Sequence, residues 1–156
     1  MWIGIDPDAR GAVATWDRDG FVGVAALPVD AGERAKVLRA CVAPGARVAL
    51  ESIPLVTSNG HVGRHTSAIR WGGLREALRV LDCDVREVEP TTWMAGLRVL
   101  WRGVDRPERK RRLHAVAERV AGASVPLAHA DAVLIGYWLR GLDPDVRGDR
   151  CVAAGG

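Results

Sequence analysis

Apolar and polar positions alternate in short runs along the first 27 residues, and turn residues separate the runs. The runs cover residues 2–6, 11–16 and 21–27, and Asp17 to Gly20 form a turn between the second and the third. Strands of this length joined by such turns are typical of an antiparallel meander. The pattern therefore predicts that the chain opens with three neighbouring strands.

Helical spacing dominates after this meander, with two further short strands. Asp30 and Glu33 have the spacing of a helix-capping box, and Asp105 and Glu108 repeat it. Apolar stripes and the turn residues at their ends predict the other elements. We expect helices after Asp30, over 71–81, over 90–97, from Asp105 to about Ala121 and from Pro126 to Gly141, and strands over 46–51 and 83–88.

This order of elements predicts an α/β fold whose mixed central sheet joins an antiparallel meander to parallel strands, with helices on both faces. A helix precedes the fourth predicted strand, and such a crossover favours parallel pairing. Residues 52–70 are polar and aperiodic, so we expect a long loop there. The chain has 156 residues, 48% of them hydrophobic, which fits one domain; we place it at 1–142, with a flexible tail at 143–156.

Composition and charge narrow the classes of protein. The net charge is +3, and arginine supplies most of the basic residues because Lys36 and Lys110 are the only lysines. Guanidinium binds phosphate well, although an arginine bias also follows from a GC-rich genome. Three cysteines lie far apart without a Cys-x-x-Cys pair, which argues against a disulfide framework or a structural zinc site. No targeting segment and no membrane-spanning stretch is visible, so we expect a soluble, cytoplasmic protein with no membrane partner.

Three carboxylates stand where predicted elements begin or end. Asp6 ends the first strand at a tight turn, Glu51 ends the fourth strand, and Asp131 lies in the first turns of the last helix among apolar residues. If the first and fourth strands are parallel neighbours, Asp6 and Glu51 lie side by side. Each residue also has a simpler explanation: a turn former, a solvated strand end and a charge that complements the helix dipole.

Four segments together carry a resemblance to a known family. They are Gly4-Ile5-Asp6-Pro7-Asp8-Ala9-Arg10-Gly11-Ala12, Glu51-Ser52-Ile53-Pro54, Pro90-Thr91-Thr92-Trp93 and Ala130-Asp131-Ala132-Val133-Leu134-Ile135. They resemble the RuvC-type Holliday junction resolvases of the ribonuclease H-like superfamily. The segments look closest to the monokaryotic chloroplast resolvases and their bacterial relatives.

The resemblance implies a homodimeric endonuclease that binds four-way junction DNA and makes two symmetric, Mg²⁺-dependent nicks, with Mn²⁺ able to replace Mg²⁺. It gives Asp6, Glu51 and Asp131 as metal ligands; a pair of ions needs a bridging carboxylate, and we expect Asp6 to be that ligand. Carboxylates are the ligands that Mg²⁺ prefers, so the residue types fit this chemistry independently. Family members usually carry another acid or histidine three or four positions before the last carboxylate. Those positions are apolar here, and His129 is either the fourth site residue or a cap or surface histidine.

Basic residues in two regions are candidate DNA contacts. The resemblance places a basic helix start at the scissile phosphate, and the arginine-rich stretch over 98–119 supplies it. A charge run is otherwise the solvated face of a helix. Basic residues in the expected loop suit insertion at a junction centre, where bases are unstacked. The candidates are Arg106 and Lys110 in the helix, and Arg64, His65 and Arg70 in the loop.

Several alternatives stay open at this point. A YqgF-type RNA-processing nuclease would keep the fold and change the substrate, and a non-catalytic junction-binding protein would keep the surface without the chemistry. The opening strand and Asp6 turn also occur in actin-like and sugar-kinase ATP domains, but these need a second, duplicated domain. Trp71 and Trp93 either stack on bases or belong to the core or a dimer interface. Without a transit peptide, a bacterial or phage source is favoured over a plastid.

Overall fold

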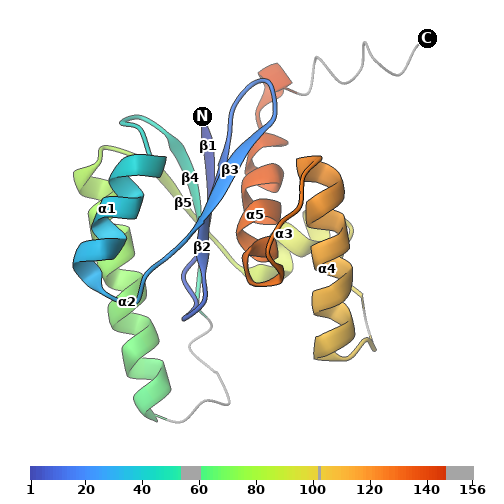
Figure 1. Cartoon of the computed structure of the whole chain (residues 1–156), viewed down its shortest axis with the longest axis horizontal. Coiled ribbons are helices and arrows are strands. Elements are labelled where there is room, and N and C mark those ends of the chain that lie inside the picture. Colours follow the sequence, from blue (N-terminus) through green and yellow to red (C-terminus); the bar gives the residue numbers. More distant parts are fainter. Residues whose placement is uncertain (54–60, 102, 147–156) are drawn as a thin grey trace.

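The computed structural model describes residues 1–53, 61–101 and 103–146, and of residues 61–67 it describes the backbone alone. A five-stranded sheet of order β3-β2-β1-β4-β5 forms the middle layer (Figure 1). The pairs β1–β2 and β2–β3 are antiparallel, whereas β1–β4 and β4–β5 are parallel. The predicted mixed sheet is therefore confirmed. Its strands are β1 (Trp2–Asp6), β2 (Ala12–Trp16), β3 (Phe21–Ala26), β4 (Arg47–Glu51) and β5 (Asp84–Val88).

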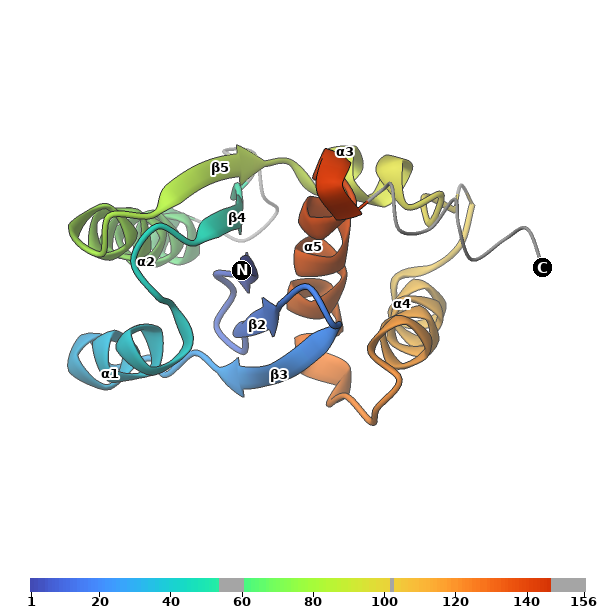
Figure 2. The same cartoon turned by 90° about the horizontal axis from the view of Figure 1, so that it is seen from above.

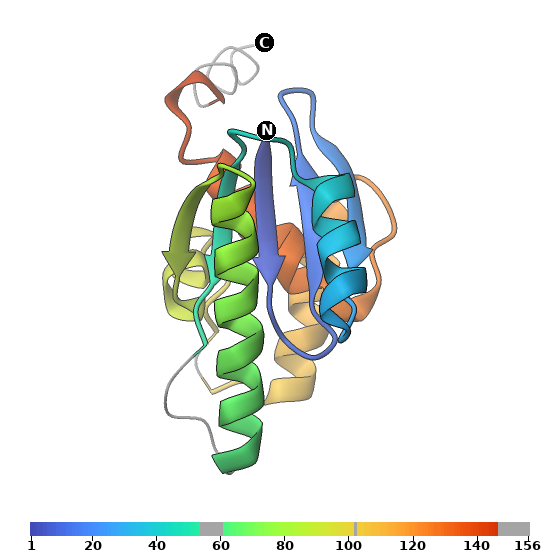
Figure 3. The same cartoon turned by 90° about the vertical axis from the view of Figure 1, so that its left-hand side faces the viewer.

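Helices cover both faces of this sheet, as the element order predicts. One face carries α1 (Ala31–Cys41) and α2 (His61–Val80), which lie in front of the strands in Figure 3. The other face carries α3 (Pro90–Gly96), α4 (Arg106–Ala121) and α5 (Ala130–Arg140), and the sheet separates the two groups in Figure 2. A short 3₁₀ turn, η1 (Leu127–His129), leads into α5. Each face has its own hydrophobic core.

Helix α5 lies directly on β1 because two glycines remove the side chains between them. A Cβ atom at Gly4 would lie 2.2 Å from the Ala132 carbonyl oxygen and 2.2 Å from the Gly136 nitrogen. Any larger residue at position 4 would push α5 away from the sheet. The close approach brings the first turn of α5 over the carboxyl end of β1.

The expected loop over 52–70 is wrong from His61 onward, because α2 begins there rather than near residue 71. The glycines in this segment weigh against a helix, but a helical glycine costs only about 1 kcal/mol. Of the side chains described in this extension, Ala68 and Ile69 are exposed, whereas Arg70 is buried and hydrogen-bonded to the segment after β3. Residues 54–60 of the expected loop lie outside the described residues.

The folded part of the chain also extends beyond the expected boundary at residue 142. Asp143 is buried and pairs with Arg47 at the start of β4, and Val146 belongs to the core on the α5 face. The structure thus differs from a tail that begins at 143, and residues 147–156 lie outside the described residues. No helix in the described ranges combines the length and apolarity needed to cross a membrane.

Candidate active site

Asp6 and Glu51 lie side by side at the carboxyl ends of neighbouring parallel strands. Ile5 pairs with Leu50 in the β1–β4 register, so the next residue of each strand stands at the same edge of the sheet. Side chains alternate between the two faces of a strand. Ile5 and Leu50 belong to the core on the α1–α2 face, so Asp6 and Glu51 point to the opposite face, on which α5 packs.

The turn after β1 holds Asp6 in place. The Asp8 backbone N–H donates a hydrogen bond of 2.9 Å to Asp6 Oδ1, and the Gly11 N–H donates to the Asp8 carbonyl. A Cβ atom at Gly11 would lie 1.9 Å from the Asp6 carbonyl oxygen, so this tight turn requires glycine. Asp6 is buried in this setting, with 6% of its surface exposed.

Asp131 completes a group of three carboxylates from three separate elements. It lies in the first turn of α5, where the helix dipole favours a negative charge. Its charge raises the pKa of both Asp6 and Glu51, which places it close to them. Asp6 and Glu51 therefore adjoin at one edge of the sheet, and Asp131 lies near enough for its charge to act on both.

Burial and mutual repulsion disfavour the charged forms of these carboxylates. Burial raises the pKa of Asp6 to about 7, the Asp131 charge adds to this rise, and the Asp8 N–H opposes it. Burial, with Asp6 as the next cause, raises the pKa of Glu51 to about 8. Burial likewise raises the pKa of Asp131, and Lys110 lowers it. Raised pKa values in a group of neighbouring acids are a signature of functional sites.

Two tryptophans hold Glu51. Trp93 Nε1 donates a hydrogen bond of 3.0 Å to Glu51 Oε1, and Trp71 Nε1 donates one of 3.2 Å to the Glu51 carbonyl oxygen. Trp93 is fully buried and Trp71 is packed against the core on the α1–α2 face. Of the two explanations open for these tryptophans, the structure therefore favours a place in the protein interior over stacking on bases.

The start of α4 brings positive charge toward the carboxylates. Charges on Lys110, Arg109 and Arg106 lower the pKa of Asp131, and Lys110 also lowers that of Asp6. Two predicted DNA contacts, Arg106 and Lys110, thus lie on the side of α4 that faces the site. They stay predictions as DNA contacts.

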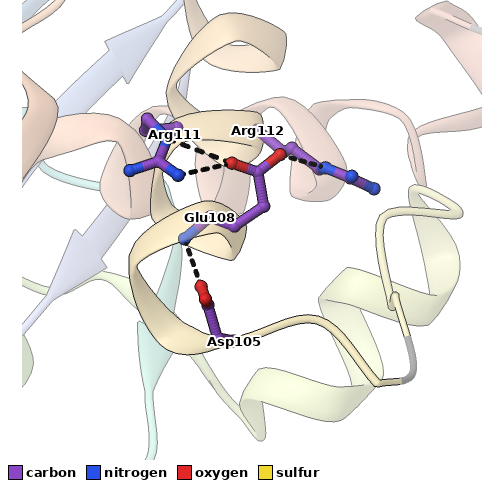
Figure 4. A network of polar contacts seen from close by, with 4 residues as sticks. All are labelled: Asp105, Glu108, Arg111 and Arg112. Carbon is purple, nitrogen blue, oxygen red and sulfur yellow. Dashed lines mark hydrogen bonds and ion pairs between the residues drawn. The ribbon is translucent and has the colours of Figure 1, made fainter.

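Two other basic residues of α4, Arg111 and Arg112, are paired with an acid on the same helix (Figure 4). Glu108 accepts hydrogen bonds from Arg111, at 2.7 and 3.0 Å, and from Arg112, at 2.8 Å. Asp105 caps the helix by accepting a bond of 2.8 Å from the Glu108 backbone N–H. This bond confirms the N-cap half of the predicted capping box, and an equivalent bond from the Glu33 N–H to Asp30 confirms the same half of the other; the side chains of Glu108 and Glu33 pair with basic residues instead of bonding back to the caps. Helix α4 therefore carries one set of cations near the carboxylates and another set paired on its surface.

His129 ends η1 directly before α5, as required for it to turn inward. Its Nδ1 atom is buried without a hydrogen-bond partner among the described residues, and burial lowers its pKa. His129 is not among the residues that most affect the pKa values of the three carboxylates. Its role as a fourth site residue stays a prediction.

Arg70 differs from the expectation of a DNA contact. Its guanidinium donates hydrogen bonds to the carbonyl oxygens of Leu27, at 2.9 Å, and Pro28, at 3.3 Å, and only 8% of its surface is exposed. It anchors α2 to the segment that follows β3, so we do not carry it forward as a DNA contact. The side chains of Arg64 and His65, predicted for the same purpose, lie outside the described residues.

Asp8 is the residue that the sequence reasoning missed. Its charge raises the pKa values of Asp6, Glu51 and Asp131, so it lies near all three. The signal was present in the tripeptide Asp-Pro-Asp at residues 6–8, where the second acid is explained equally well by the turn itself. Asp8 is exposed and therefore stands at the open side of the group.

The chemistry of these side chains fits a divalent cation. Buried acids whose charges repel one another gain stability from a cation, and carboxylate oxygens are the ligands that Mg²⁺ prefers. In the described part of the chain, no three or more His, Cys, Asp or Glu side chains are arranged so that they could hold a metal ion as they stand.

The mixed five-stranded sheet with helices on both faces is an α/β fold of the ribonuclease H-like type. No family model and no curated protein matches the chain. Two solved structures of RuvC from Thermus thermophilus do match, one of them in complex with a Holliday junction substrate. They are 15% and 17% identical, with TM-scores of 0.63 and 0.62, and each match covers 90% of this chain and 94% of the other. The predicted fold class is confirmed, and so is the resemblance to RuvC at the level of the fold; closeness to the chloroplast resolvases stays a prediction.

Proposed function

We propose that this protein is a divalent-metal-dependent endonuclease that cuts four-way DNA junctions. The observation that carries the proposal is the group formed by Asp6, Glu51 and Asp131 at one sheet edge. Asp6 is buried and the other two are half-buried, their like charges repel one another, and the basic start of α4 lies near them. The fold shared with RuvC, one structure of which holds a Holliday junction substrate, supports the same conclusion.

Each part of this site has a use in phosphodiester hydrolysis. Asp6, Glu51 and Asp131 would hold Mg²⁺, or Mn²⁺ in its place, and the bound metal supplies an activated water and charge stabilisation at the leaving oxygen. Asp6, which adjoins Glu51 across the β1–β4 pair and whose pKa also responds to the charge of Asp131, is the best candidate for the bridging ligand. Lys110 and Arg106 bring positive charge to the place where the phosphate must lie, since phosphate contacts position nucleic acids.

Junction DNA requires a second copy of the chain. Resolving a four-way junction takes two symmetric cuts, whereas the described residues form a single group of this kind. We therefore propose a homodimer in which each protomer cuts one strand. Its substrate would be DNA in the cytoplasm of a bacterial or phage-infected cell, and a plastid is the alternative location.

A gel assay with synthetic four-way junctions tests the proposal. With Mg²⁺, the wild type should convert the junction into pairs of nicked duplexes and leave linear duplex intact. Asp6→Asn should bind the junction without cutting it, because the substitution removes a metal ligand and leaves the basic surface unchanged. Binding should weaken steeply as salt rises, since phosphate contacts release counterions.

Other outcomes would replace the proposal with a competing one. A wild type that binds junctions but never cuts them with Mg²⁺ or Mn²⁺ would be a non-catalytic junction-binding protein. Cleavage of structured RNA in preference to junction DNA would support a function of the YqgF type. Equal loss of binding and cutting in Asp6→Asn would indicate a folding defect, which circular dichroism of the variant would identify.

A further inference from the structure

Glu51 accepts hydrogen bonds from two indole N–H groups, one at its side chain and one at its main chain. Trp93 Nε1 lies 3.0 Å from the side-chain oxygen Oε1, and Trp71 Nε1 lies 3.2 Å from the main-chain carbonyl oxygen. An indole nitrogen is a donor only, so each bond has a fixed direction. One tryptophan therefore fixes where the carboxylate points, and the other fixes the backbone that carries it.

The indole of Trp93 reaches Glu51 because of how α3 leaves the sheet. Glu51 pairs with Val88 in the β4–β5 register, and α3 begins two residues after Val88. Ser52 ties the two strand ends together: its N–H donates to the Val88 carbonyl at 2.8 Å, and its hydroxyl donates to the same oxygen at 3.2 Å. Trp93, in the first turns of α3, is thereby directed back toward the end of β4.

Trp93 has no freedom to leave this position. None of its surface is exposed, and it belongs to the core that α3, α4 and α5 build on the sheet. In a close-packed interior a buried ring does not change rotamer without cost to its neighbours. The donor thus stands at a fixed point, and Glu51 Oε1 must come to it.

Trp71 is itself held in place, though from the other face. The Arg75 guanidinium lies 5.7 Å from the centroid of the Trp71 ring, and Arg75 Nε forms an ion pair of 2.9 Å with Glu87 on β5. This chain of contacts ties α2 to the backbone of β4. It supports the main chain of Glu51 but makes no contact with the carboxylate.

We propose that Trp93 is a positioning residue of the metal site: its indole N–H occupies Glu51 Oε1 and would leave Oε2 as the oxygen available to a cation. The inference rests on the proposed function. A hydrogen bond to a carboxylate favours its charged form, which is the form that binds metal. Partners of this kind, one step removed from the ion, typically change metal affinity 10- to 100-fold when they are lost.

Trp93→Phe removes the donor and keeps an aromatic ring, and Trp16→Phe is its matched control. Trp16 is equally buried, at 1% exposed, and its Nε1 donates a bond of 3.2 Å to the Val133 carbonyl. It lies at the opposite end of the sheet, because Trp16 pairs with Trp2 whereas Asp6 pairs with Ala12. The two substitutions therefore remove the same atoms from the same kind of environment, and only one of them touches Glu51.

The measurement is Mn²⁺ affinity without DNA, by electron paramagnetic resonance of the free ion. We expect Trp93→Phe to weaken Mn²⁺ binding about 10- to 100-fold, and Trp16→Phe to change it less than about twofold. In a Glu51→Gln background, Trp93→Phe should have no further effect, because the two residues act through one carboxylate. Equal affinities for Trp93→Phe and Trp16→Phe would overturn the proposal, as would a wild type that binds no Mn²⁺.

A second measurement uses the wild type alone, so it can be made even if the Trp93 variant fails to fold. In the ¹⁵N–¹H spectrum of the wild type, the indole signal of Trp93 should move as Mg²⁺ is added, and the signal of Trp16 should not. A Trp93 signal that stays still at saturating Mg²⁺ would overturn the proposal. If Trp93 passes both tests but junctions are never cut, the positioning role stands and the proposed function is wrong. If junctions are cut but Trp93 fails these tests, the proposed function stands and only the positioning role of Trp93 is wrong.

Discussion

The tripeptide Asp-Pro-Asp occurs twice in this chain, at opposite ends of the sheet, and its two copies have opposite surroundings. In each copy the first aspartate is buried, with 6% of Asp6 and 8% of Asp143 exposed. In each, its Oδ1 accepts a hydrogen bond from the N–H two residues on, at 2.9 and 3.0 Å. The Oδ2 atom of Asp143 pairs with Arg47, whereas no ion pair is found for Asp6 among the described residues.

The difference shows where the protein provides its own counter-charge and where it leaves that to a ligand. An unpaired buried charge is costly, and a neighbouring acid makes it more so. At the Asp143 end, the chain's own Arg47 compensates the buried charge. At the Asp6 end, Glu51 and Asp131 add further negative charge, which is the arrangement expected where an external cation belongs.

The largest expected effect separates the two aspartates by function. Asp6→Asn should reduce junction cleavage about 1,000-fold or more, which corresponds to about 4 kcal/mol in the barrier. Asp143→Asn should leave the cleavage rate within about twofold and lower the free energy of unfolding by about 1 kcal/mol, because the half-exposed Arg47 loses its partner. Cleavage rates and denaturant unfolding curves of both variants are the measurements. Similar losses of activity in the two would break the comparison.

The pH dependence of stability is the next largest effect. The unfolded chain loses the protons of Asp6 and Glu51 below about pH 5, whereas in the folded chain their pKa values are about 7 and about 8. The folded state thus holds more protons between these limits, so the metal-free protein should become less stable as pH rises from 5 to 8. We expect a loss of roughly 6 kcal/mol from the two groups together.

Denaturant unfolding in the presence of a chelator, at several pH values, measures this loss. Asp6→Asn should flatten the profile, because it removes one titrating group and relieves Glu51 of its charged neighbour. A wild-type profile that is level or rises between pH 5 and 8 would contradict the raised pKa values.

A smaller effect should appear within α4, between cations that face the site and cations that are paired. Lys110→Ala should slow junction cleavage about 10-fold and lower the salt dependence of binding by about one ion. Arg111→Ala should slow cleavage less than about threefold and leave the salt dependence of binding nearly unchanged, since Arg111 is already paired with Glu108. Cleavage rates and binding over a series of salt concentrations measure both. Equal effects would mean that α4 binds DNA as one uniform basic surface.

The sequence predicts the parts of this site that depend on local order. The meander, the crossover helix and the strand ending at Glu51 are enough to place Asp6 beside it, and the apolar stripe around Asp131 predicts the helix that brings in the third acid. Turn residues, N-cap residues and the spacing of apolar positions predict these elements, and all of them can be recognised within a short stretch of sequence. The fold class followed from the same signals.

The partners of these residues were beyond sequence reasoning because they are far apart along the chain. Arg47 pairs with Asp143 across 96 positions, and Trp93 reaches Glu51 across 42. The burial of Arg70 depends on carbonyl groups after β3, 42 and 43 positions away along the chain. Local patterns carry no information about such contacts.

Thermal unfolding at pH 8 of the wild type and Asp6→Asn, each with chelator and with saturating Mg²⁺, tests the central claim most directly. The asparagine keeps an oxygen for the Asp8 N–H and removes only the charge. Without metal, Asp6→Asn should be the more stable protein, because like-charge repulsion is relieved. Mg²⁺ at 100 times its dissociation constant should stabilise the wild type by about 2.7 kcal/mol and should change Asp6→Asn far less, because the variant lacks one of the ligands. A wild type that Mg²⁺ stabilises no more than it stabilises Asp6→Asn would contradict the claim that this end of the sheet is built for a cation.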